Sequence, residues 1–334
     1  MDPDSLSDAG RAVHGGSSLR LDFSANTNPE RPPGVRQVYE AAFDASTRYP
    51  DEAYADYRAA AADYVDCAAE EVVPTSGGTE AIRLALATHV SPGDSVLVPT
   101  PSFGEYAREV RLQGATPAFV PHDEVLDFPP EHHTAAVVCT PNNPTGELVD
   151  PEALADFAAR CRRAGTLLVV DEAFLDFTTT ESLAGTPGTV VCRSLTKLFG
   201  LPGLRMGFAC ATGDPYERLE TARPAWNLST PAAAVGAHCL RQDAFVERTR
   251  ERVARERERM CDALVEAGYE VLDSDAPFYL LDVGARSVDS VVEHLAAEDI
   301  AVRDCRSFGL ANHVRVAVKR REENDRLLEA LARV

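Results

Sequence analysis

The sequence contains very little lysine. Arginine supplies most of its 33 basic residues, and lysine occurs only at Lys197 and Lys319. The 53 acidic residues give a formal net charge of −20, which repels nucleic acid and anionic membranes. Because such carboxylate-rich, lysine-poor surfaces resemble those of salt-adapted proteins, we expect a halophilic protein with neither a nucleic acid nor a membrane as its partner.

Long apolar runs are absent as well. No stretch reaches the roughly 20 apolar residues that a membrane helix requires. The first residues, MDPDSLSDAG, are acidic where a signal peptide would be basic and then apolar. These absences predict a cytoplasmic protein.

Paired cysteines are also missing. The eight cysteines are scattered singly, with neither a CxxC spacing nor the nearby histidines that would indicate zinc. The histidines at positions 122, 132 and 133 stand beside Asp123 and Glu131 but match no ligand motif. We therefore expect free thiols, a surface loop around these histidines, and no metal.

Between about residues 70 and 210, short β-branched runs alternate with amphipathic helical stretches. This order is typical of parallel strands joined by crossover helices, so we predict an α/β fold. After Pro231 we expect one long charged helix through about Glu266, and then a small α+β domain. The predicted strands are 95–99, 135–139, 167–170, 189–192 and 206–210, and the predicted helices include 79–89 and 151–163.

Two motifs that fall at the ends of predicted strands could bind a ligand, since ligands bind there in α/β sheets. SGGTE at 76–80 opens a helix, so its backbone amides would cradle a phosphate, although a glycine turn is also an ordinary helix start. PNNPTG at 141–146 would fix an asparagine amide at the sheet edge, or would be only a loop.

Two further motifs carry charged groups. Asp171 and Glu172 directly follow an apolar strand, where a carboxylate is partly desolvated and requires a cationic partner. In SLTKLFGLPGLR at 194–205, Lys197 stands among apolar residues, which should lower its pKa and free its amine to attack an aldehyde. Arginine cannot do this, because its guanidinium stays protonated. Since the chain otherwise almost avoids lysine, we favour this interpretation over a surface lysine.

In order and approximate spacing, SGGTEAI, PNNPTG, DEAFLDF and SLTKLFGLPGLRMGF resemble the motifs of fold-type I aminotransferases, which use pyridoxal 5′-phosphate (PLP). The match spans most of the chain. The resemblance implies a homodimer with shared active sites and a large PLP-binding domain (35–228) around a mostly parallel seven-stranded sheet. It also implies an N-terminal segment (1–34) that closes the active site, and a linking helix with a small C-terminal domain (229–334).

By motif position, Lys197 would hold PLP as a Schiff base, and Asp171 would pair with the protonated pyridine nitrogen so that the ring withdraws electrons. These are the predicted catalytic residues. Phe174 stands where many family members have a tyrosine that donates to the phenolic oxygen, so Asn143 would mainly tune the cofactor. The remaining implied cofactor contacts are Gly78, Thr79, Ser194 and Arg205 at the phosphate, Phe103 stacked on the ring, Asn143 at the phenolic oxygen, and Tyr49 at the phosphate of the neighbouring subunit.

Within the family the chain is similar to the branch of threonine-phosphate decarboxylases of cobalamin biosynthesis and histidinol-phosphate aminotransferases. The forms HGG (14–16), DFSANTNP (22–29), PSFGEY (101–106), RSLTK (193–197) and RDC (303–305) favour the decarboxylase. The resemblance implies His14 and Arg303 at the substrate phosphate and Arg315 at the α-carboxylate, with Asn26 and Asn28 helping to close the site. Alternatively, His14 belongs to a disordered tail and Arg303 to a surface ion pair.

The predicted reaction is decarboxylation of L-threonine O-3-phosphate to (R)-1-amino-2-propanol O-2-phosphate. The alternative is a histidinol-phosphate aminotransferase that uses 2-oxoglutarate and glutamate. The two diverge according to which Cα bond stands perpendicular to the cofactor ring, and motifs do not encode that angle. A non-catalytic PLP-binding regulator is a third hypothesis, disfavoured by the intact Lys197 and Asp171 and by an N-terminal segment too short for a DNA-binding module.

Overall fold

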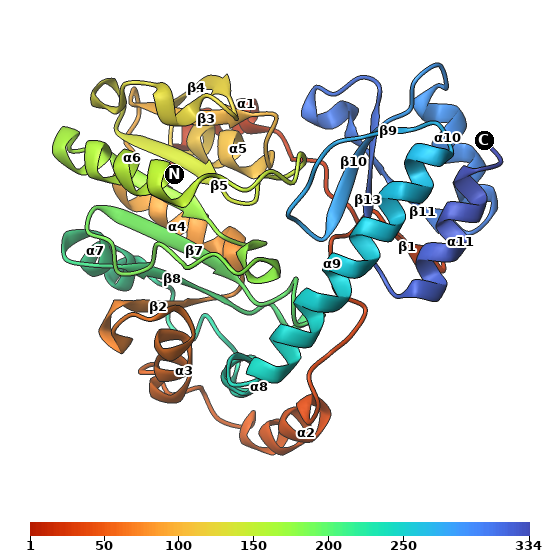
Figure 1. The fold of residues 1–334 in the computed structure, drawn as a ribbon. Coiled ribbons are helices and arrows are strands. Elements are labelled where there is room, and N and C mark those ends of the chain that lie inside the picture. The colour runs from red at the N-terminus through yellow and green to blue at the C-terminus, as the bar shows by residue number, and fades with distance from the viewer.

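The computed structural model describes residues 1–334, except for the side chain of Asp8. A larger body is built around a seven-stranded sheet and a smaller body around a four-stranded sheet. Helix α9 (Asp243–Glu266) runs diagonally from the larger body to the smaller one (Figure 1).

The large sheet confirms the predicted α/β class, with strand order β2-β8-β7-β6-β5-β3-β4. Its strands pair in parallel except β8, which is antiparallel to both of its neighbours. The strands are β2 (Val72–Thr75), β3 (Ser95–Thr100), β4 (Thr116–Pro121), β5 (Ala135–Cys139), β6 (Leu167–Asp171), β7 (Thr189–Ser194) and β8 (Gly207–Ala211).

Helices cover both faces of this sheet, because its central strands are apolar on both sides. Successive residues point to opposite faces, so Val137 packs with α4, α5 and α7, whereas Val138 packs with α3 and α6. The helices of the larger body are α2 (Val35–Ala45), which packs on α8 rather than on the sheet, α3 (Ala55–Val65), α4 (Gly78–His89), α5 (Glu105–Leu112), α6 (Pro151–Ala164), α7 (Asp214–Ala222) and α8 (Thr230–Leu240).

The prediction of one long helix after Pro231 was wrong in one respect, because this segment forms two helices. Helix α8 ends at Leu240, and α9 begins at Asp243. A Cβ added at Gly236 of α8 would lie 2.4 Å from the Tyr57 ring of α3, so α8 packs on the larger body, and it is α9 that runs on to the smaller one (Figure 1). The proposed domain boundary at residues 228 and 229 stays a prediction.

The smaller body has the sheet order β12-β13-β10-β9, and all its pairings are antiparallel. Helices α10 (Val288–Ala297) and α11 (Arg321–Leu331) belong to the same part of the chain. Its strands are β9 (Glu270–Val271), β10 (Phe278–Asp282), β12 (Arg303–Asp304) and β13 (His313–Ala317).

The N-terminal segment contacts both bodies. It starts with η1 (Pro3–Ser5) and α1 (Leu6–Ala9), beside α5 of the larger body. It then reaches the smaller body, where β1 (Leu21–Asp22) pairs in parallel with β11 (Ile300–Ala301). The remaining short helices are η2 (Ala69–Glu71), η3 (Val125–Asp127), η4 (Pro130–His132), η5 (Leu175–Phe177), η6 (Pro202–Leu204) and η7 (Cys305–Phe308).

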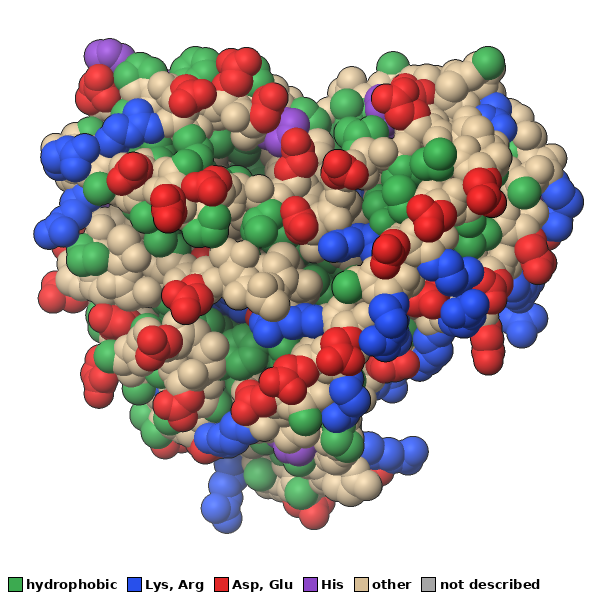
Figure 2. Space-filling model, in the orientation of Figure 1, with side chains coloured by type: hydrophobic (Ala, Val, Ile, Leu, Met, Phe, Trp, Pro, Cys, Tyr) green, Lys and Arg blue, Asp and Glu red, His purple; other side chains and the backbone are tan. Residues whose placement is uncertain are grey.

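Acidic side chains are spread over both bodies on the face seen in Figure 2. Within the described residues, no helix is both long and apolar enough to span a bilayer. The same residues contain no cluster of three His, Cys, Asp or Glu that could hold a metal ion, and all eight cysteines are free. Cytoplasmic location and halophilic character stay predictions.

Candidate active site

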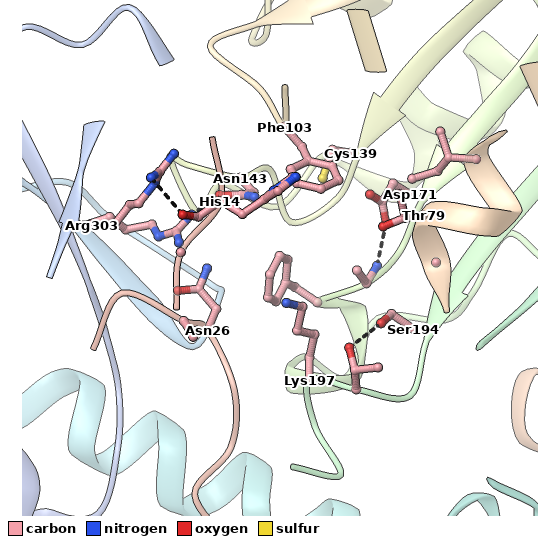
Figure 3. A pocket seen from close by; sticks show the side chains of 18 of the residues that line it. His14, Asn26, Thr79, Phe103, Cys139, Asn143, Asp171, Ser194, Lys197 and Arg303 are labelled. Carbon is pink, nitrogen blue, oxygen red and sulfur yellow. Dashed lines mark hydrogen bonds between the residues drawn. The ribbon is translucent and has the colours of Figure 1, made fainter. Parts of the chain in front are cut away.

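A cavity of about 390 Å³ is lined by residues of the sheet edge, the smaller body and the N-terminal segment. Strands β5, β6 and β7 are neighbours and parallel, so their carboxyl ends meet at one edge. In Figure 3, Arg303 and His14 lie at one end of the cavity and Asp171, Thr79 and Ser194 at the other. The predicted residues that line it are His14, Asn26, Gly78, Thr79, Phe103, Asn143, Asp171, Ser194, Lys197, Arg205, Arg303 and Arg315.

Lys197 extends into the cavity from the loop that follows β7 (Figure 3). Its Nζ lies 5.8 Å from the ring centroid of Phe174. Burial, and after it the positive charge of Arg315, lowers the pKa of Lys197 to about 8, whereas Asp171 opposes the shift. A neutral amine is a nucleophile, so this lysine fits a cofactor that carries an aldehyde.

Asp171 is the last residue of β6 and only 5% exposed. The Tyr106 hydroxyl donates to its Oδ2 at 2.6 Å, and the Ala173 N–H donates to its Oδ1 at 3.0 Å. Burial raises the pKa of Asp171, while these hydrogen bonds and Lys197 act against the rise. The next residue, Glu172, is paired with Arg193, whose Nη1 lies 2.7 Å away. Asp171 therefore remains free to pair with a cationic ring nitrogen.

The glycine motif that is predicted to cradle a phosphate lies at the start of helix α4. Gly77 has a φ of +110°, and a Cβ there would lie 2.6 Å from Nη2 of Arg205. Helix α4 begins at Gly78, so its unpaired N–H groups lie beside this guanidinium and the Ser194 hydroxyl. A helix N-terminus with an arginine and hydroxyl groups fits a phosphate.

Aromatic side chains line the part of the cavity where the ring of a cofactor would lie. Phe103 stands just before α5, with its ring perpendicular to that of Tyr106 at a centroid distance of 5.6 Å. Phe174 packs edge-on against Phe278 and has no hydroxyl with which to donate a hydrogen bond. Asn143 accepts from Nη1 of Arg315, which leaves its amide N–H₂ as a donor.

Two buried polar atoms of the wall have no hydrogen-bond partner among the described residues, namely Nε of Arg315 and Oδ1 of Asn26. Arg315 is 5% exposed, and Asn26 is 3% exposed. Nη2 of Arg315 donates to the backbone oxygen of Ser24 at 3.0 Å. Because buried polar atoms are normally paired, a free donor and a free acceptor in one wall fit a ligand with both a carboxylate and an amine.

His14 and Arg303 are held together at the junction of the two bodies. Arg303 donates to the backbone oxygens of Val13 (2.7 Å) and His14 (3.2 Å). Nε2 of His14 lies 2.9 Å from Oε1 of Glu105. Arg303 is buried and pairs with no carboxylate among the described residues, so it is not part of a surface ion pair. The His14 side chain is about half exposed but touches Phe103, and its role stays a prediction.

Two predicted residues lie outside the cavity. Tyr49 is 77% exposed and stacks on Trp226 at a centroid distance of 4.3 Å. Asn28 donates from Nδ2 to the Leu198 oxygen at 2.7 Å and accepts from Nη2 of Arg252 at 2.7 Å, so it anchors the N-terminal segment. In one chain, neither contacts the site.

Sequence reasoning missed Glu105, Tyr106 and Phe308. The first two belong to the PSFGEY motif, in which only Phe103 was assigned a role. A helix at 105–112 places Tyr106 one turn from Phe103, and that spacing was the available signal. Phe308 lines the cavity under two arginines, 5.2 Å from Arg303 and 5.9 Å from Arg315.

The sequence matches the family model described as aminotransferase class I and II over residues 20–331. It is 32% identical to histidinol-phosphate aminotransferase 2 of Archaeoglobus fulgidus, over 94% of this chain and 93% of that protein. It is 33% identical to a protein of Caldanaerobacter subterraneus subsp. tengcongensis provisionally named threonine-phosphate decarboxylase, over 92% of this chain and 88% of that protein.

Among solved structures, the fold is similar to that of histidinol-phosphate aminotransferase from Sinorhizobium meliloti in complex with pyridoxal-5′-phosphate. The TM-score is 0.85 at 20% identity, and the match covers all of this chain and 94% of that one. At this identity the likeness shows the fold alone.

Proposed function

Because the chain belongs to the family of class I and II aminotransferases, whose cofactor is PLP, we propose that it decarboxylates L-threonine O-3-phosphate. The products are (R)-1-amino-2-propanol O-2-phosphate and CO2, and the reaction belongs to cobalamin biosynthesis. When bound, PLP supplies an electron-withdrawing ring conjugated to the substrate nitrogen. The glycine cradle, Asp171 and Lys197 would hold it.

The observation that carries this proposal is that two guanidinium groups, those of Arg303 and Arg315 on neighbouring strands, line one cavity. Arg315 lies beside Asn143, whereas His14 and Arg303 lie together at the junction of the bodies. The proposed substrate has two anionic ends, and each needs its own receptor. Described residues engage three of the five N–H donors of Arg303, so two remain for a phosphate.

The side chains that line the cavity would each bind a different part of the substrate or act on it. Arg315 would clamp the α-carboxylate through its unpaired Nε, and Oδ1 of Asn26 would accept from the substrate. The N-terminal segment would exclude water by covering the cavity, because its residues 13–15 and 24–26 form part of the lining. Nζ of Lys197 would take up the proton that the substrate ammonium group gives up on binding, and would donate it to Cα in place of the departed CO2.

A second candidate is histidinol-phosphate aminotransferase, favoured by the 32% identity to the Archaeoglobus protein. The same His14 and Arg303 would receive the phosphate of histidinol phosphate. That substrate has no carboxylate, so Arg315 would act only when glutamate or 2-oxoglutarate binds.

The deciding experiment is to incubate the PLP-loaded protein with L-threonine O-3-phosphate while measuring CO2 and the cofactor spectrum. We expect stoichiometric CO2 with the visible cofactor band retained, and no CO2 from L-threonine, which lacks the phosphate. Loss of that band on adding glutamate, without CO2 from the phosphorylated substrate, would support the aminotransferase instead.

We also propose that the protein is a homodimer in which Tyr49 completes the site of the neighbouring subunit. The exposed stack of Tyr49 on Trp226 supports this, since large exposed aromatic side chains are typical of interfaces.

A further inference from the structure

Tyr106 is a buried residue for which the cofactor motifs assign no role. It lies in the first turn of α5 and is 0% exposed. Its hydroxyl donates a 2.6 Å hydrogen bond to Asp171, and its ring packs perpendicular to that of Phe103. One short segment thus presents a ring to the cavity and a hydroxyl to the carboxylate.

The two donors to Asp171 come from different places. The Ala173 N–H belongs to the loop that follows Asp171 itself, whereas the Tyr106 hydroxyl comes from another helix. Each donor binds one carboxylate oxygen, so together they fix the plane of the group. Every carboxylate oxygen can accept two hydrogen bonds, and a lone pair therefore remains for a ring nitrogen.

The surroundings of Tyr106 and Asp171 keep the Tyr106 hydroxyl protonated, so that it acts as a hydrogen-bond donor. Burial raises the pKa of Tyr106 well above its usual value, and the nearby Asp171 charge adds to that rise. The Tyr106 hydrogen bond is the largest influence that opposes the burial-driven rise in the pKa of Asp171. The other titratable groups that act on Asp171, or on which it acts, are Lys197, Glu172, Cys139 and Cys192.

We infer that Tyr106 is a positioning residue for the cofactor: its hydroxyl orients the Asp171 carboxylate so that both the plane and the charge of that group suit the protonated ring nitrogen of PLP. The inference depends on the cofactor and holds for either reaction. It can therefore fail while the proposed decarboxylation stands, or stand while the decarboxylation fails.

The test is Tyr106→Phe, which removes the hydroxyl and keeps the ring. We expect the Kd of the apo-protein for PLP to rise about tenfold, which corresponds to about 1.4 kcal/mol. Without the donor, Asp171 takes up a proton at a higher pH, so the acid-side loss of PLP affinity should also move to higher pH. Titration of apo-protein with PLP at several pH values measures both effects without turnover.

Tyr269→Phe is the matched control. Tyr269 is also buried and donates to a backbone oxygen, that of Leu331 at 3.1 Å, but it lies in the smaller body. It should leave PLP affinity unchanged. In an Asp171→Asn background, Tyr106→Phe should add no further loss. The inference would be overturned by a folded Tyr106→Phe protein that binds PLP with wild-type affinity and loses that affinity at the same acidic pH as the wild type.

If Tyr106→Phe does not fold, 3-fluorotyrosine placed at position 106 gives a second test. The fluorine makes the hydroxyl a stronger donor and nearly preserves the size of the ring. The acid-side loss of PLP affinity should then move to lower pH. A loss of affinity at an unchanged pH would contradict a role for the hydroxyl.

Discussion

At the residue scale, lysine scarcity makes the cofactor attachment testable without ambiguity. Only Lys197 and Lys319 carry side-chain amines, and Nζ of Lys319 donates to the backbone oxygens of Ala25 and Thr27. Borohydride reduction of the PLP-loaded protein should fix the cofactor to Lys197 alone, as read by mass spectrometry of peptides. Lys319→Arg should label normally and Lys197→Ala should not. A label on Lys319 would contradict the assignment.

The lowered pKa of Lys197 predicts a pH dependence. Only the neutral amine attacks the aldehyde, and the pKa of Lys197 is about 8 rather than the ordinary lysine value of 10.5. The rate of PLP uptake by apo-protein should therefore rise as pH increases through about 8 and level off above it. Stopped-flow absorbance measures this rate.

Arg315 is the second cause of that shift, after burial, and provides a matched variant. Arg315→Met removes a positive charge near Lys197, so the pKa of the lysine should rise. The midpoint of the pH dependence of PLP uptake should therefore move to higher pH. Arg306→Met, an exposed change in the same part of the chain, should leave it in place. A midpoint that moves down with Arg315→Met would show that another group controls the uptake.

The candidate site was predictable where a residue directly follows an apolar strand. Asp171 is the last residue of β6 and Lys197 lies in the loop just after β7, and the fold brings them together because these strands are neighbours. Tyr106 was not predictable as their partner, because its contact with Asp171 joins residues 65 positions apart through the packing of α5. Local sequence does not encode such a contact.

At the element scale, predicted strands and helices agree with the structure to within two residues at their ends, since these elements are long and apolar. The helix break at Arg241 and Gln242 was missed because neither residue disfavours a helix strongly. The pairing of β1 with β11 involves two residues in each strand, so only tertiary contacts define it. Strand β4 was also not predicted.

Another feature at this scale is how the N-terminal segment is held. Backbone oxygens of the segment accept hydrogen bonds from Arg303, Arg315 and Lys319, all of which follow α10 in the smaller body. Lys319 is the one of these three that does not line the cavity. The segment is therefore anchored by cations that are partly independent of substrate binding.

Lys319→Met should loosen the segment without touching the cofactor. We expect faster proteolysis within residues 13–27 and a KM for the phosphorylated substrate raised about threefold to tenfold, in line with the loss of one or two hydrogen bonds. PLP affinity should be unchanged. Arg333→Met, which removes an exposed ion pair with Glu298, is the control. Unchanged proteolysis with Lys319→Met would show that the other anchors suffice.

At the scale of the whole molecule, Tyr49 does not reach the candidate active site of its own chain. Its side chain is exposed, outside the cavity, and supported only by Trp226 among the rings of the described residues. In a homodimer with an isologous interface, each subunit can lend such a residue to its partner. The two sites of the dimer would then each contain residues of both chains, and this predicts complementation.

Differently tagged Tyr49→Ala and Lys197→Ala chains, co-expressed and purified as the mixed dimer, test that prediction. The Tyr49→Ala chain keeps its own Lys197 and would receive Tyr49 from its partner, so one site is complete and the other lacks both residues. The mixed dimer should regain about half of the wild-type activity and bind about one PLP tightly, whereas each variant alone should show much less. A mixed dimer no more active than the mean of the two variants would mean that Tyr49 does not cross the interface.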